Sequence, residues 1–588
     1  MKACVLKKTL FILLLFSVTV WALPSGIESA IGKSGIDKKD ISIYIKEAGK
    51  GSCVVASLNA NRLRTPASVI KVLTTYAAVL KLGFDYRWPT VFYSRGRIAN
   101  GVLHGDLIIK GYGDPTLSDE DLPKIISRIK AAGIERITGD IVIDRSYFKV
   151  GSRNTSGFDN HPYSPYNAMP DAMMFNERVS TICVIPKLNS VTKKTPDQSF
   201  VVHNQLQHVN RPCRGRYSWP HVKIDDSKAV PEVWLKGKIS KRCGKREICQ
   251  VLTKPYQSFY YALKAALGEE GITVGGRLRL HPLPKGAKVL FTHYSASLEK
   301  IVSKTAKKSN NLYARHLLLL LGAKMYGAPA TVAKGRKAVR IILRANGALG
   351  TSLPHIDNGC GLSRTSKITA KILASVLDNA YSRYGMRWMQ TLSIAGRDGT
   401  IKKRFRGTVV RNRAWMKTGT LKHVKNIAGY VKSRNGRYYT AVILVNSKHA
   451  RWKAAKMQDA IITWLVHYQK RGSATAQKPK AFVPETKTVH KSKPETRFAQ
   501  PAPKDAHGRY YIQTGSFKHY PKAFYLQKLK KASLPYRIVP GKEFKVLTGP
   551  YATEVRAREA LAKVRDSVDR GAFLTTKEKL DEEGARLY

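Results

Sequence analysis

The chain has 588 residues, about four times the length of a typical ~150-residue domain, which argues against a single compact core. Apolar residues make up 43% of the sequence and aromatic residues 9%, so an intrinsically disordered protein is excluded. Lysine and arginine number 103 against 40 acidic residues, and the formal charge of +63 favours polyanionic partners such as nucleic acid, acidic lipid or an anionic cell wall.

The N-terminus has the pattern of an export signal. Basic residues precede the apolar run Thr9–Trp21, and Ala22 follows it as a small residue at a cleavage position. We therefore predict a signal peptide over residues 1–22. A retained membrane anchor is the alternative, but the run is short for a span of ~20 residues. No later segment holds ~18 uncharged apolar residues, so the mature protein is expected to be soluble in the periplasm.

Export bears on the cysteines and on the basic surface. Cys4 leaves with the signal, so six of the seven cysteines remain in a compartment where disulfides can form. Cys243 and Cys249 stand close enough to close a small loop, and the pairing stays open because spacing alone does not fix it. Export also argues against nucleic acid as the partner of the positive charge, and favours anions of the wall or outer membrane.

Five regions follow the signal. Residues 23–89 hold a short strand pattern and then a helical one, and residues 288–470 return to helical periods before a final strand and helix. Residues 90–287 between them are rich in strand and turn patterns. Residues 471–508 contain five prolines and no apolar period, which predicts an extended, disordered linker, and residues 509–575 form a separate small module. An α/β multidomain protein is therefore expected.

The first chemical pattern is Ser68-Val69-Ile70-Lys71. Pro66 suits a helix start and apolar residues follow at helical spacing, so the segment is predicted to be a buried helix. Residues at i and i+3 share a helix face, which brings Lys71 within reach of the Ser68 hydroxyl. A serine needs a base to become a nucleophile, and a buried lysine near other cations can lose its proton and act as that base. Ser-x-x-Lys alone arises by chance in a lysine-rich chain.

Two further patterns follow in order. Ser309-Asn310-Asn311 opens a helical pattern, where an ordinary N-cap would also place polar side chains. Lys417-Thr418-Gly419 precedes a strand-like run and by itself could be a turn. Ser-x-x-Lys, Ser-x-Asn and Lys-Thr-Gly in this order are typical of penicillin-recognising serine enzymes. The three together, in an exported chain, indicate a serine acyl-transfer enzyme.

Other segments carry a closer resemblance, over about residues 40–465: Gly113-Asp114-Pro115-Thr116, Thr138-Gly139-Asp140-Ile141, Gly361-Leu362-Ser363-Arg364, Ala395-Gly396-Arg397-Asp398-Gly399-Thr400 and Asn426-Ile427-Ala428-Gly429-Tyr430. With these segments the chain resembles the D-alanyl-D-alanine carboxypeptidase/endopeptidase family of low-molecular-mass penicillin-binding proteins, class C. The resemblance implies a penicillin-binding-protein transpeptidase-like (β-lactamase-like) catalytic domain in two parts, 23–89 and 288–470. It also implies that the strand-rich residues 90–287 are inserted domains.

The resemblance implies roles for the catalytic residues. Ser68 would attack the substrate carbonyl, Lys71 would accept the serine proton, and Ser309 would relay a proton to the leaving amine. The backbone N–H groups of Ser68 and Thr420 would form the oxyanion hole, which stabilises charge that develops in the transition state. The resemblance implies neither a metal nor another cofactor.

The same resemblance implies a substrate site, made of Asn311, Lys417, Thr418, Gly419, Thr420, Arg364 and Lys422. Asn311 would hold the substrate amide, and Lys417 with Thr418 would bind the terminal carboxylate, since an anion needs a cation and hydrogen-bond donors. Arg364 and Lys422 are equally well explained as solvated surface charges. Asp159 is one candidate for a carboxylate that the inserted domains lend to the cleft.

The C-terminal module shows a β-α-β-β-α-β order of strand and helix patterns, with Gln513-Thr514-Gly515-Ser516-Phe517 on its first strand. It resembles a SPOR (sporulation-related repeat) domain, an α+β module that binds glycan strands stripped of peptide at division sites. The resemblance implies glycan contacts at Gln513 and Ser516, although strand-end capping explains both residues equally well. The topology also fits an RNA-binding platform, and export argues against RNA.

We therefore predict a serine-type D-Ala-D-Ala carboxypeptidase/endopeptidase that edits peptidoglycan stem peptides, binds β-lactam antibiotics and is directed by its SPOR domain to septal glycan. A serine β-lactamase is one alternative, and it would release bound penicillin quickly. A non-catalytic peptidoglycan-binding protein is another, and the intact motifs argue against it. Nucleic acid is not expected as a partner, nor is a stable membrane span after signal cleavage.

Overall fold

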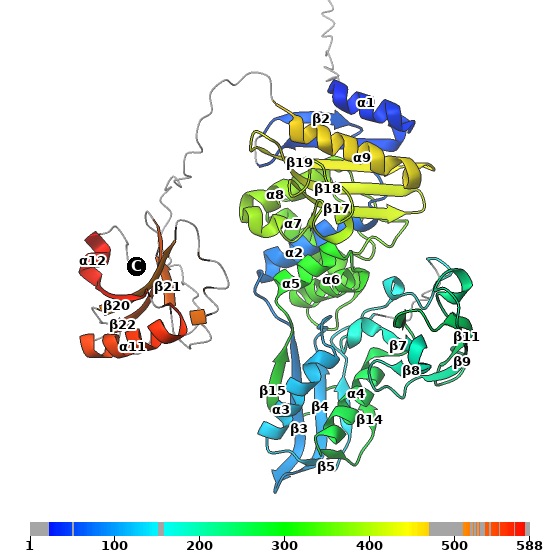
Figure 1. Cartoon of the computed structure of the whole chain (residues 1–588), viewed down its shortest axis with the longest axis vertical. Coiled ribbons are helices and arrows are strands. Elements are labelled where there is room, and N and C mark those ends of the chain that lie inside the picture. Colours follow the sequence, from blue (N-terminus) through cyan, green and yellow to red (C-terminus); the bar gives the residue numbers. More distant parts are fainter. Residues whose placement is uncertain are drawn as a thin grey trace, which may run out of the picture. The chain divides into compact units, whose positions relative to one another are not determined.

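The computed structural model describes residues 23–49, 52–150, 158–469, 510–517, 521, 525, 528–529, 536–539, 543–551, 553–569 and 571–582. The chain forms two compact units, Met1–Ser473 and Ala474–Tyr588 (Figure 1). The predicted signal peptide and linker lie outside the described residues. Within the described part, no helix is both long enough and apolar enough to cross a membrane.

A six-stranded sheet forms the centre of the catalytic domain, in the order β16-β17-β18-β19-β1-β2. Its strands are β1 (Ile41–Glu47), β2 (Val54–Leu58), β16 (Ser393–Ile394), β17 (Ala414–Leu421), β18 (Val424–Lys432) and β19 (Tyr438–Asn446). Strand β1 pairs antiparallel with β19, in the register Ile43↔Ile443. The first and last parts of the catalytic domain therefore share one sheet, although some four hundred residues separate them.

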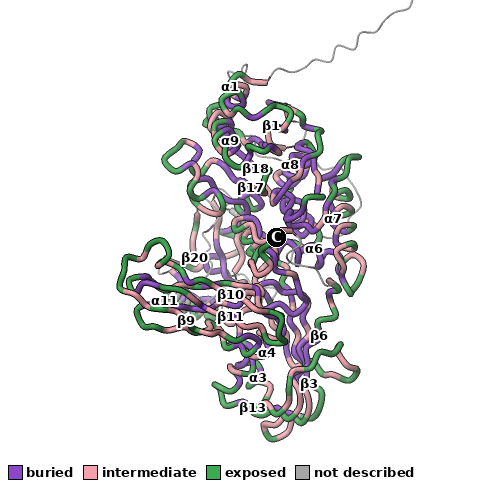
Figure 2. The backbone as a smooth tube through the Cα atoms, turned by 90° about the vertical axis from the view of Figure 1, so that its right-hand side faces the viewer, coloured by how far each residue is buried: buried purple, intermediate pink, exposed green. Residues whose placement is uncertain are grey.

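Both faces of this sheet are covered by helices. Alternate residues of β19 point to opposite sides: Ile443 and Val445 pack with α1 (Ser25–Ser34) and α9 (Ala450–His467). Val442 and Leu444 pack with the larger helical cluster on the other side. That cluster contains α2 (Lys71–Leu82), α5 (Leu298–Lys307), α6 (Asn311–Tyr326), α7 (Val332–Ala345) and α8 (Ala370–Met389). Figure 2 shows the buried residues concentrated along β17, β18, α6 and α8.

Helix α6 lies at the centre of the helical cluster. Leucines 317–321 are all buried, and apolar side chains surround the helix, as expected for a helix enclosed by others. Asn310 is its N-cap: the side-chain oxygen accepts a hydrogen bond from the backbone N–H of Tyr313. Asn310 is also the middle residue of the predicted Ser-x-Asn motif, so this cap fixes the start of the helix within the motif.

The insertion consists of two lobes. The first lobe is a seven-stranded sheet of β3 (Pro89–Ala99), β4 (Val102–Gly111), β5 (Arg136–Ile137), β6 (Ile141–Asp144), β13 (Thr273–Val274), β14 (Leu278–Leu280) and β15 (Lys288–Tyr294). Helices α3 (Leu122–Ala131) and α4 (Pro255–Glu269) share its core. Strand β15 pairs with β3, so residues 288–294, which were expected to open the second part of the catalytic domain, belong to the sheet of the insertion.

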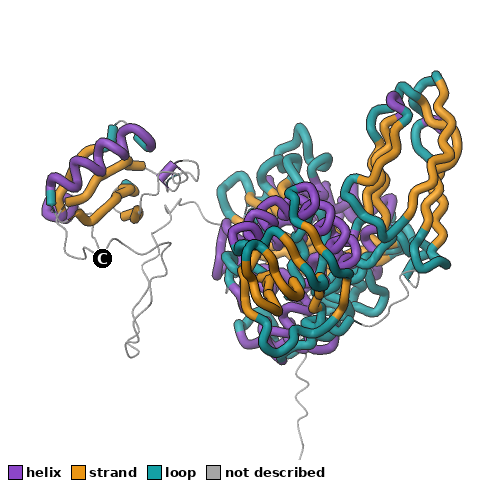
Figure 3. The backbone as a smooth tube through the Cα atoms, turned by 90° about the horizontal axis from the view of Figure 1, so that it is seen from below, coloured by secondary structure: helices purple, strands orange, loops and turns teal. Residues whose placement is uncertain are grey.

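The second lobe has two three-stranded sheets, β12-β7-β8 and β10-β11-β9. Their strands are β7 (Ser180–Ile185), β8 (Ser190–Lys193), β9 (Val201–Val209), β10 (His221–Asp225), β11 (Glu232–Ser240) and β12 (Arg246–Gln250). Figure 3 shows strands that stand away from the rest of the unit, at upper right. A disulfide joins Cys213 to Cys243 in this lobe. Cys249 lies instead on β12 opposite Thr181 of β7, so it does not close the small loop with Cys243 that the spacing allows.

The C-terminal unit is a four-stranded antiparallel sheet in the order β21-β22-β20-β23. Its strands are β20 (Tyr510–Phe517), β21 (Tyr536–Val539), β22 (Phe544–Tyr551) and β23 (Phe573–Thr576). Helix α11 (Glu554–Ser567) packs Leu561 and Val564 against Ile512 and Val546 of the sheet, and α12 (Lys577–Glu582) follows β23. Most of the helix predicted between β20 and β21 lies outside the described residues.

Candidate active site

Three segments from distant parts of the sequence meet at Ser68. Ser68 lies in a short 3-10 helix, Ala67–Ile70, that runs directly into α2. A Cβ atom at Gly361 would lie 2.0 Å from the Ala67 carbonyl oxygen, and one at Gly419 would lie 2.9 Å from the Ser68 nitrogen. Since real Cβ atoms do not approach backbone this closely, only glycine fits at either position. Ala67 itself has a φ of +48°, so the backbone around the serine is tightly constrained.

Lys71 is fully buried next to the serine. Its Nζ lies 2.8 Å from Ser68 Oγ, 2.7 Å from Asn311 Oδ1 and 2.5 Å from the Cys360 carbonyl oxygen. Burial lowers the pKa of Lys71 to about 8, and the charge of Arg315 also lowers it. A neutral amine has two N–H donors, which suit Asn311 and Cys360, and a lone pair, which suits the Ser68 hydroxyl. The geometry is that of a serine with its base.

Lys417 on β17 is the second buried cation of the site. Its Nζ donates to Ser309 Oγ at 2.9 Å and to the Thr418 carbonyl oxygen at 2.7 Å. Burial lowers the pKa of Lys417 well below its usual value, and the positive charge of Lys71 lowers it further. An anion bound beside Lys417 would raise that pKa again, so the site suits a carboxylate. Ser309 thus lies beside Lys417, and Asn311 beside Lys71.

The inserted domains reach this site through residues 158–167. Asn311 Nδ2 donates to the Tyr166 carbonyl oxygen at 3.0 Å. Arg364 donates to the Phe158 carbonyl oxygen at 3.2 Å, and its guanidinium group lies over the Phe158 ring. The carboxylate of Asp159 accepts hydrogen bonds of 2.8 Å from the Tyr166 hydroxyl and from the Asn167 side-chain amide. Arg364 therefore contacts the segment of the insertion that also carries Asp159.

The remaining predicted site residues lie along β17 and in the C-terminal unit. Thr418 Oγ1 donates to Thr400 Oγ1 at 2.8 Å, whereas Thr420 is exposed near the end of the strand and Lys422 is exposed in the turn that follows. In the C-terminal unit, Gln513 is buried on β20, and Ser516 Oγ donates to a carboxylate oxygen of Glu543 at 2.6 Å. These last two predicted residues are not part of the serine site's unit.

Some residues of the site had not been predicted to act there. The Cys360 carbonyl accepts from Lys71, but a backbone carbonyl has no sequence pattern. Asn426 of β18 donates through Nδ2 to the carbonyl oxygens of Thr65 and Pro66, at 3.0 and 2.9 Å. It thereby holds the residues that precede Ser68 against β18. The sequence pattern that could have indicated this role is a lone amide side chain within an otherwise apolar strand. Once buried, such an amide requires a hydrogen-bond partner.

The fold and site define a serine acyl-transfer enzyme of the penicillin-binding class. The sequence is in agreement: residues 23–468 match the D-Ala-D-Ala carboxypeptidase 3 (S13) family, and residues 506–576 match the SPOR domain. The chain belongs to the D-Ala-D-Ala carboxypeptidase 3 (S13) family and carries a C-terminal SPOR domain. It is an enzyme, and its family and its SPOR domain make it a cell-wall-associated, extracytoplasmic protein.

Relatives and solved structures cover most of the catalytic unit. The chain is 29% identical to the D-alanyl-D-alanine carboxypeptidase DacB of Haemophilus influenzae over 412 residues, which is 67% of this chain and 82% of the relative. It is 28% identical to a D-alanyl-D-alanine carboxypeptidase of an Actinomadura species over 421 residues, 68% of this chain and 77% of that one. The crystal structure of Haemophilus influenzae penicillin-binding protein 4 covers 75% of this chain and 99% of that chain, at 24% identity and a TM-score of 0.64. A second structure of that protein, at 25% identity and a TM-score of 0.60, covers the same 75% of this chain and all of that chain, and is complexed with a β-lactam.

Proposed function

We propose that the protein is a serine-type D-Ala-D-Ala carboxypeptidase/endopeptidase that trims or uncrosslinks peptidoglycan stem peptides through an acyl-enzyme at Ser68. The observation that carries the proposal is the 2.8 Å contact between Lys71 Nζ and Ser68 Oγ, made by a fully buried lysine whose pKa burial lowers to about 8. The names of the relatives, D-alanyl-D-alanine carboxypeptidases, support the same reaction.

Acylation follows from this arrangement. Neutral Lys71 takes the Ser68 proton while Oγ forms a bond to the carbonyl carbon of the penultimate D-Ala. The backbone N–H groups of Ser68 and Thr420 stabilise the oxyanion. The close approach of Gly419 on β17 to the Ser68 nitrogen supports this assignment. The C–N bond then breaks, and the proton that Lys71 took from Ser68 passes through Ser309 to the leaving amine.

Recognition of the terminal carboxylate is assigned to Lys417 and Thr418. Since burial favours the neutral form of Lys417 in the free enzyme, the arriving carboxylate favours its protonation and forms a charge-assisted hydrogen bond. Asn311 holds the substrate amide. Arg364 and Lys422, at the borders of the site, contribute to the choice of peptide. Water then attacks the acyl-enzyme carbonyl, and the bond between that carbon and Ser68 Oγ breaks. The trimmed peptide is released, and one proton of the water passes to Ser68 Oγ.

The place of action is the periplasm, with enrichment at the septum. A signal peptide over residues 1–22, cleaved near Ala22, would export the chain, and the Cys213–Cys243 disulfide fits an oxidising compartment. N-terminal sequencing of the mature protein is expected to begin at about Leu23, and a chain that begins at Met1 would contradict export. The SPOR domain supports binding to denuded glycan, through Gln513 and Ser516.

Intact-mass spectrometry after treatment with penicillin tests the reaction. We expect one adduct that persists on the protein and that is lost in Ser68→Ala. The control is Ser375→Ala, which removes a half-buried serine hydroxyl of α8 and should leave the adduct in place. An adduct that survives in Ser68→Ala contradicts the assignment. An adduct that is rapidly released as hydrolysed penicillin would indicate a β-lactamase instead, and digestion of purified wall fragments identifies the peptide bond that is cut.

A further inference from the structure

The turn Asn176–Arg178 of the inserted domains has a left-handed backbone conformation, which residues other than glycine seldom adopt. Asn176, Glu177 and Arg178 have φ values of +45°, +53° and +59°. This left-handed region is uncommon for residues other than glycine, and a run of such residues persists only where the surroundings determine it. The contacts of this turn with its surroundings therefore determine its conformation.

Both neighbours of Glu177 are fastened to the inserted domains. The Asn176 side chain accepts a hydrogen bond from the backbone N–H of Asp119 at 3.1 Å and donates to Thr195 Oγ1 at 3.1 Å. Arg178 donates to the Met169 carbonyl oxygen at 3.1 Å. Glu177 stands between these anchored residues, at the apex of the turn.

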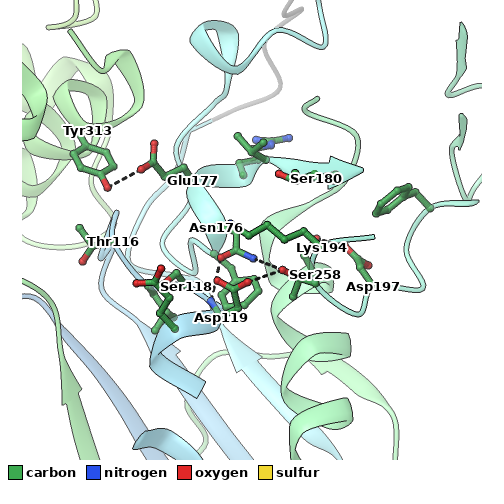
Figure 4. Close-up of a pocket in the computed structure, with 18 of the residues that line it drawn as sticks. Thr116, Ser118, Asp119, Asn176, Glu177, Ser180, Lys194, Asp197, Ser258 and Tyr313 are labelled. Carbon is green, nitrogen blue, oxygen red and sulfur yellow. Dashed lines mark hydrogen bonds between the residues drawn. The ribbon is translucent and has the colours of Figure 1, made fainter. Parts of the chain in front are cut away.

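The Glu177 carboxylate reaches across to the catalytic domain. Its Oε1 accepts from the Tyr313 hydroxyl at 3.0 Å and forms an ion pair of 2.6 Å with Lys304 of α5. Its Oε2 accepts from Asn310 Nδ2 at 2.8 Å. Figure 4 shows Glu177 and Tyr313 facing each other at a polar cavity of about 410 Å³. One carboxylate thus joins the insertion to the residues at the start of α6.

Asn310 is the link from Glu177 to the chemistry. Its amide nitrogen binds Glu177 and its amide oxygen caps α6, so both ends of the side chain are held. The residue before it, Ser309, has a φ of +55° and lies 2.9 Å from Lys417 Nζ. The residue after it, Asn311, lies 2.7 Å from Lys71 Nζ. A shift of Asn310 would therefore move both motif side chains.

We propose that Glu177 is a positioning residue of the active site, which holds Asn310 from the inserted domain and thereby fixes Ser309 and Asn311. The inference rests on the proposed acyl-transfer function of Ser68. It gives the insertion a part in aligning the catalytic groups in addition to any contact with substrate. The Glu177 side chain is 33% exposed, so solvent weakens its interactions and a moderate effect on rate is expected.

Two measurements on Glu177→Ala and Glu177→Gln test the proposal. The first is the second-order rate constant for acylation of Ser68 by penicillin. It should fall about 10-fold in Glu177→Ala, because the hydrogen bonds to the charged carboxylate are lost. It should fall less in Glu177→Gln, because that variant preserves the shape of the side chain. The second is hydrogen exchange at the start of α6, which should rise at the Tyr313 amide. Glu299→Gln is the matched control, since Glu299 on α5 is 39% exposed and pairs with Arg387 away from the site. It should leave both measurements unchanged.

A double-mutant cycle separates positioning from general stability. If Glu177 acts through Asn310, Glu177→Ala should add no further loss of rate in an Asn310→Ala background. Additive losses, or wild-type rate and exchange in Glu177→Ala, overturn the proposal. Should Glu177→Ala not fold, Glu177→Gln carries the same cycle, since it preserves the shape of the side chain. Absence of any Ser68 adduct in the wild type and in Glu299→Gln would refute the proposed function, and the exchange comparison would still decide the role of Glu177.

Discussion

Lys71 determines the pH dependence that we expect for acylation. The neutral amine is the form that accepts the Ser68 proton, and burial brings its pKa down to about 8 from a usual value above 10. Below that pKa the lysine is protonated and cannot act as a base, so the acylation rate at saturating penicillin, whose bound carboxylate favours protonated Lys417, should rise with pH through about 8 and then level off. Penicillin acylation followed from about pH 6 to about pH 10 measures this profile.

Removal of the Lys71 amine should lower the plateau itself. Lys71→Ala is expected to slow acylation by ~10² or more, because a positioned general base contributes on that order. Lys371→Ala is the matched control, since Lys371 is exposed at the start of α8. A wild-type rate and profile in Lys71→Ala would mean that another group is the base.

At the scale of residues, the sequence was informative where chemistry follows local spacing. Ser68 and Lys71 are three positions apart on one helical stretch, and the structure places their side chains in contact. The Cys360 carbonyl and Glu177 could not be predicted, because their contacts join segments that are more than a hundred residues apart in sequence. Such contacts depend on tertiary packing, which no local pattern encodes.

At the scale of elements, the contact between the Gly361 loop and the Ser68 turn is the tightest part of the site. Gly361 has a φ of +84°, and a Cβ there would lie 2.0 Å from the Ala67 carbonyl oxygen. Gly361→Ala should therefore displace the serine turn and slow acylation on the order of 10²-fold, since misplacement of reacting groups by about 1 Å has an effect of that size. Gly350→Ala, at a position where a Cβ meets nothing within 4 Å, should acylate normally. Equal rates in the two variants would show that the loop tolerates the added carbon.

Regular elements with strong periodicity were predictable, and their pairing was not. The helical pattern that Ser309-Asn310-Asn311 opens corresponds to α6, and the strand-like run expected after Lys417-Thr418-Gly419 corresponds to β18. Strand β1 was not predicted, and its pairing with β19 joins the first and last parts of the catalytic domain in one sheet. Strands β5 and β13 have two residues each, too few for an alternation of apolar residues to show.

At the scale of the whole molecule, catalysis and wall binding are expected to be separable. The serine site is contained in the unit Met1–Ser473, which has its own hydrophobic cores, and the SPOR domain belongs to the unit Ala474–Tyr588. Removal of the residues after about 470 should therefore leave penicillin acylation and hydrolysis of small D-Ala-D-Ala peptides nearly unchanged. It should abolish binding to peptide-free glycan and enrichment at the septum.

The glycan pull-down must exclude non-specific attraction to the basic surface, because a chain with a formal charge of +63 binds many polyanions at low salt. Exposed charges are screened beyond about 8 Å at physiological ionic strength, so the pull-down is performed at that salt or above. The double variant Gln513→Ala/Ser516→Ala should bind glycan less than full-length protein, whereas Val555→Ala, 67% exposed on α11, should bind normally. Glycan binding by the truncated protein equal to that of the full chain would rule out the SPOR domain as the targeting device. Loss of peptide hydrolysis on truncation would show instead that the two units depend on each other.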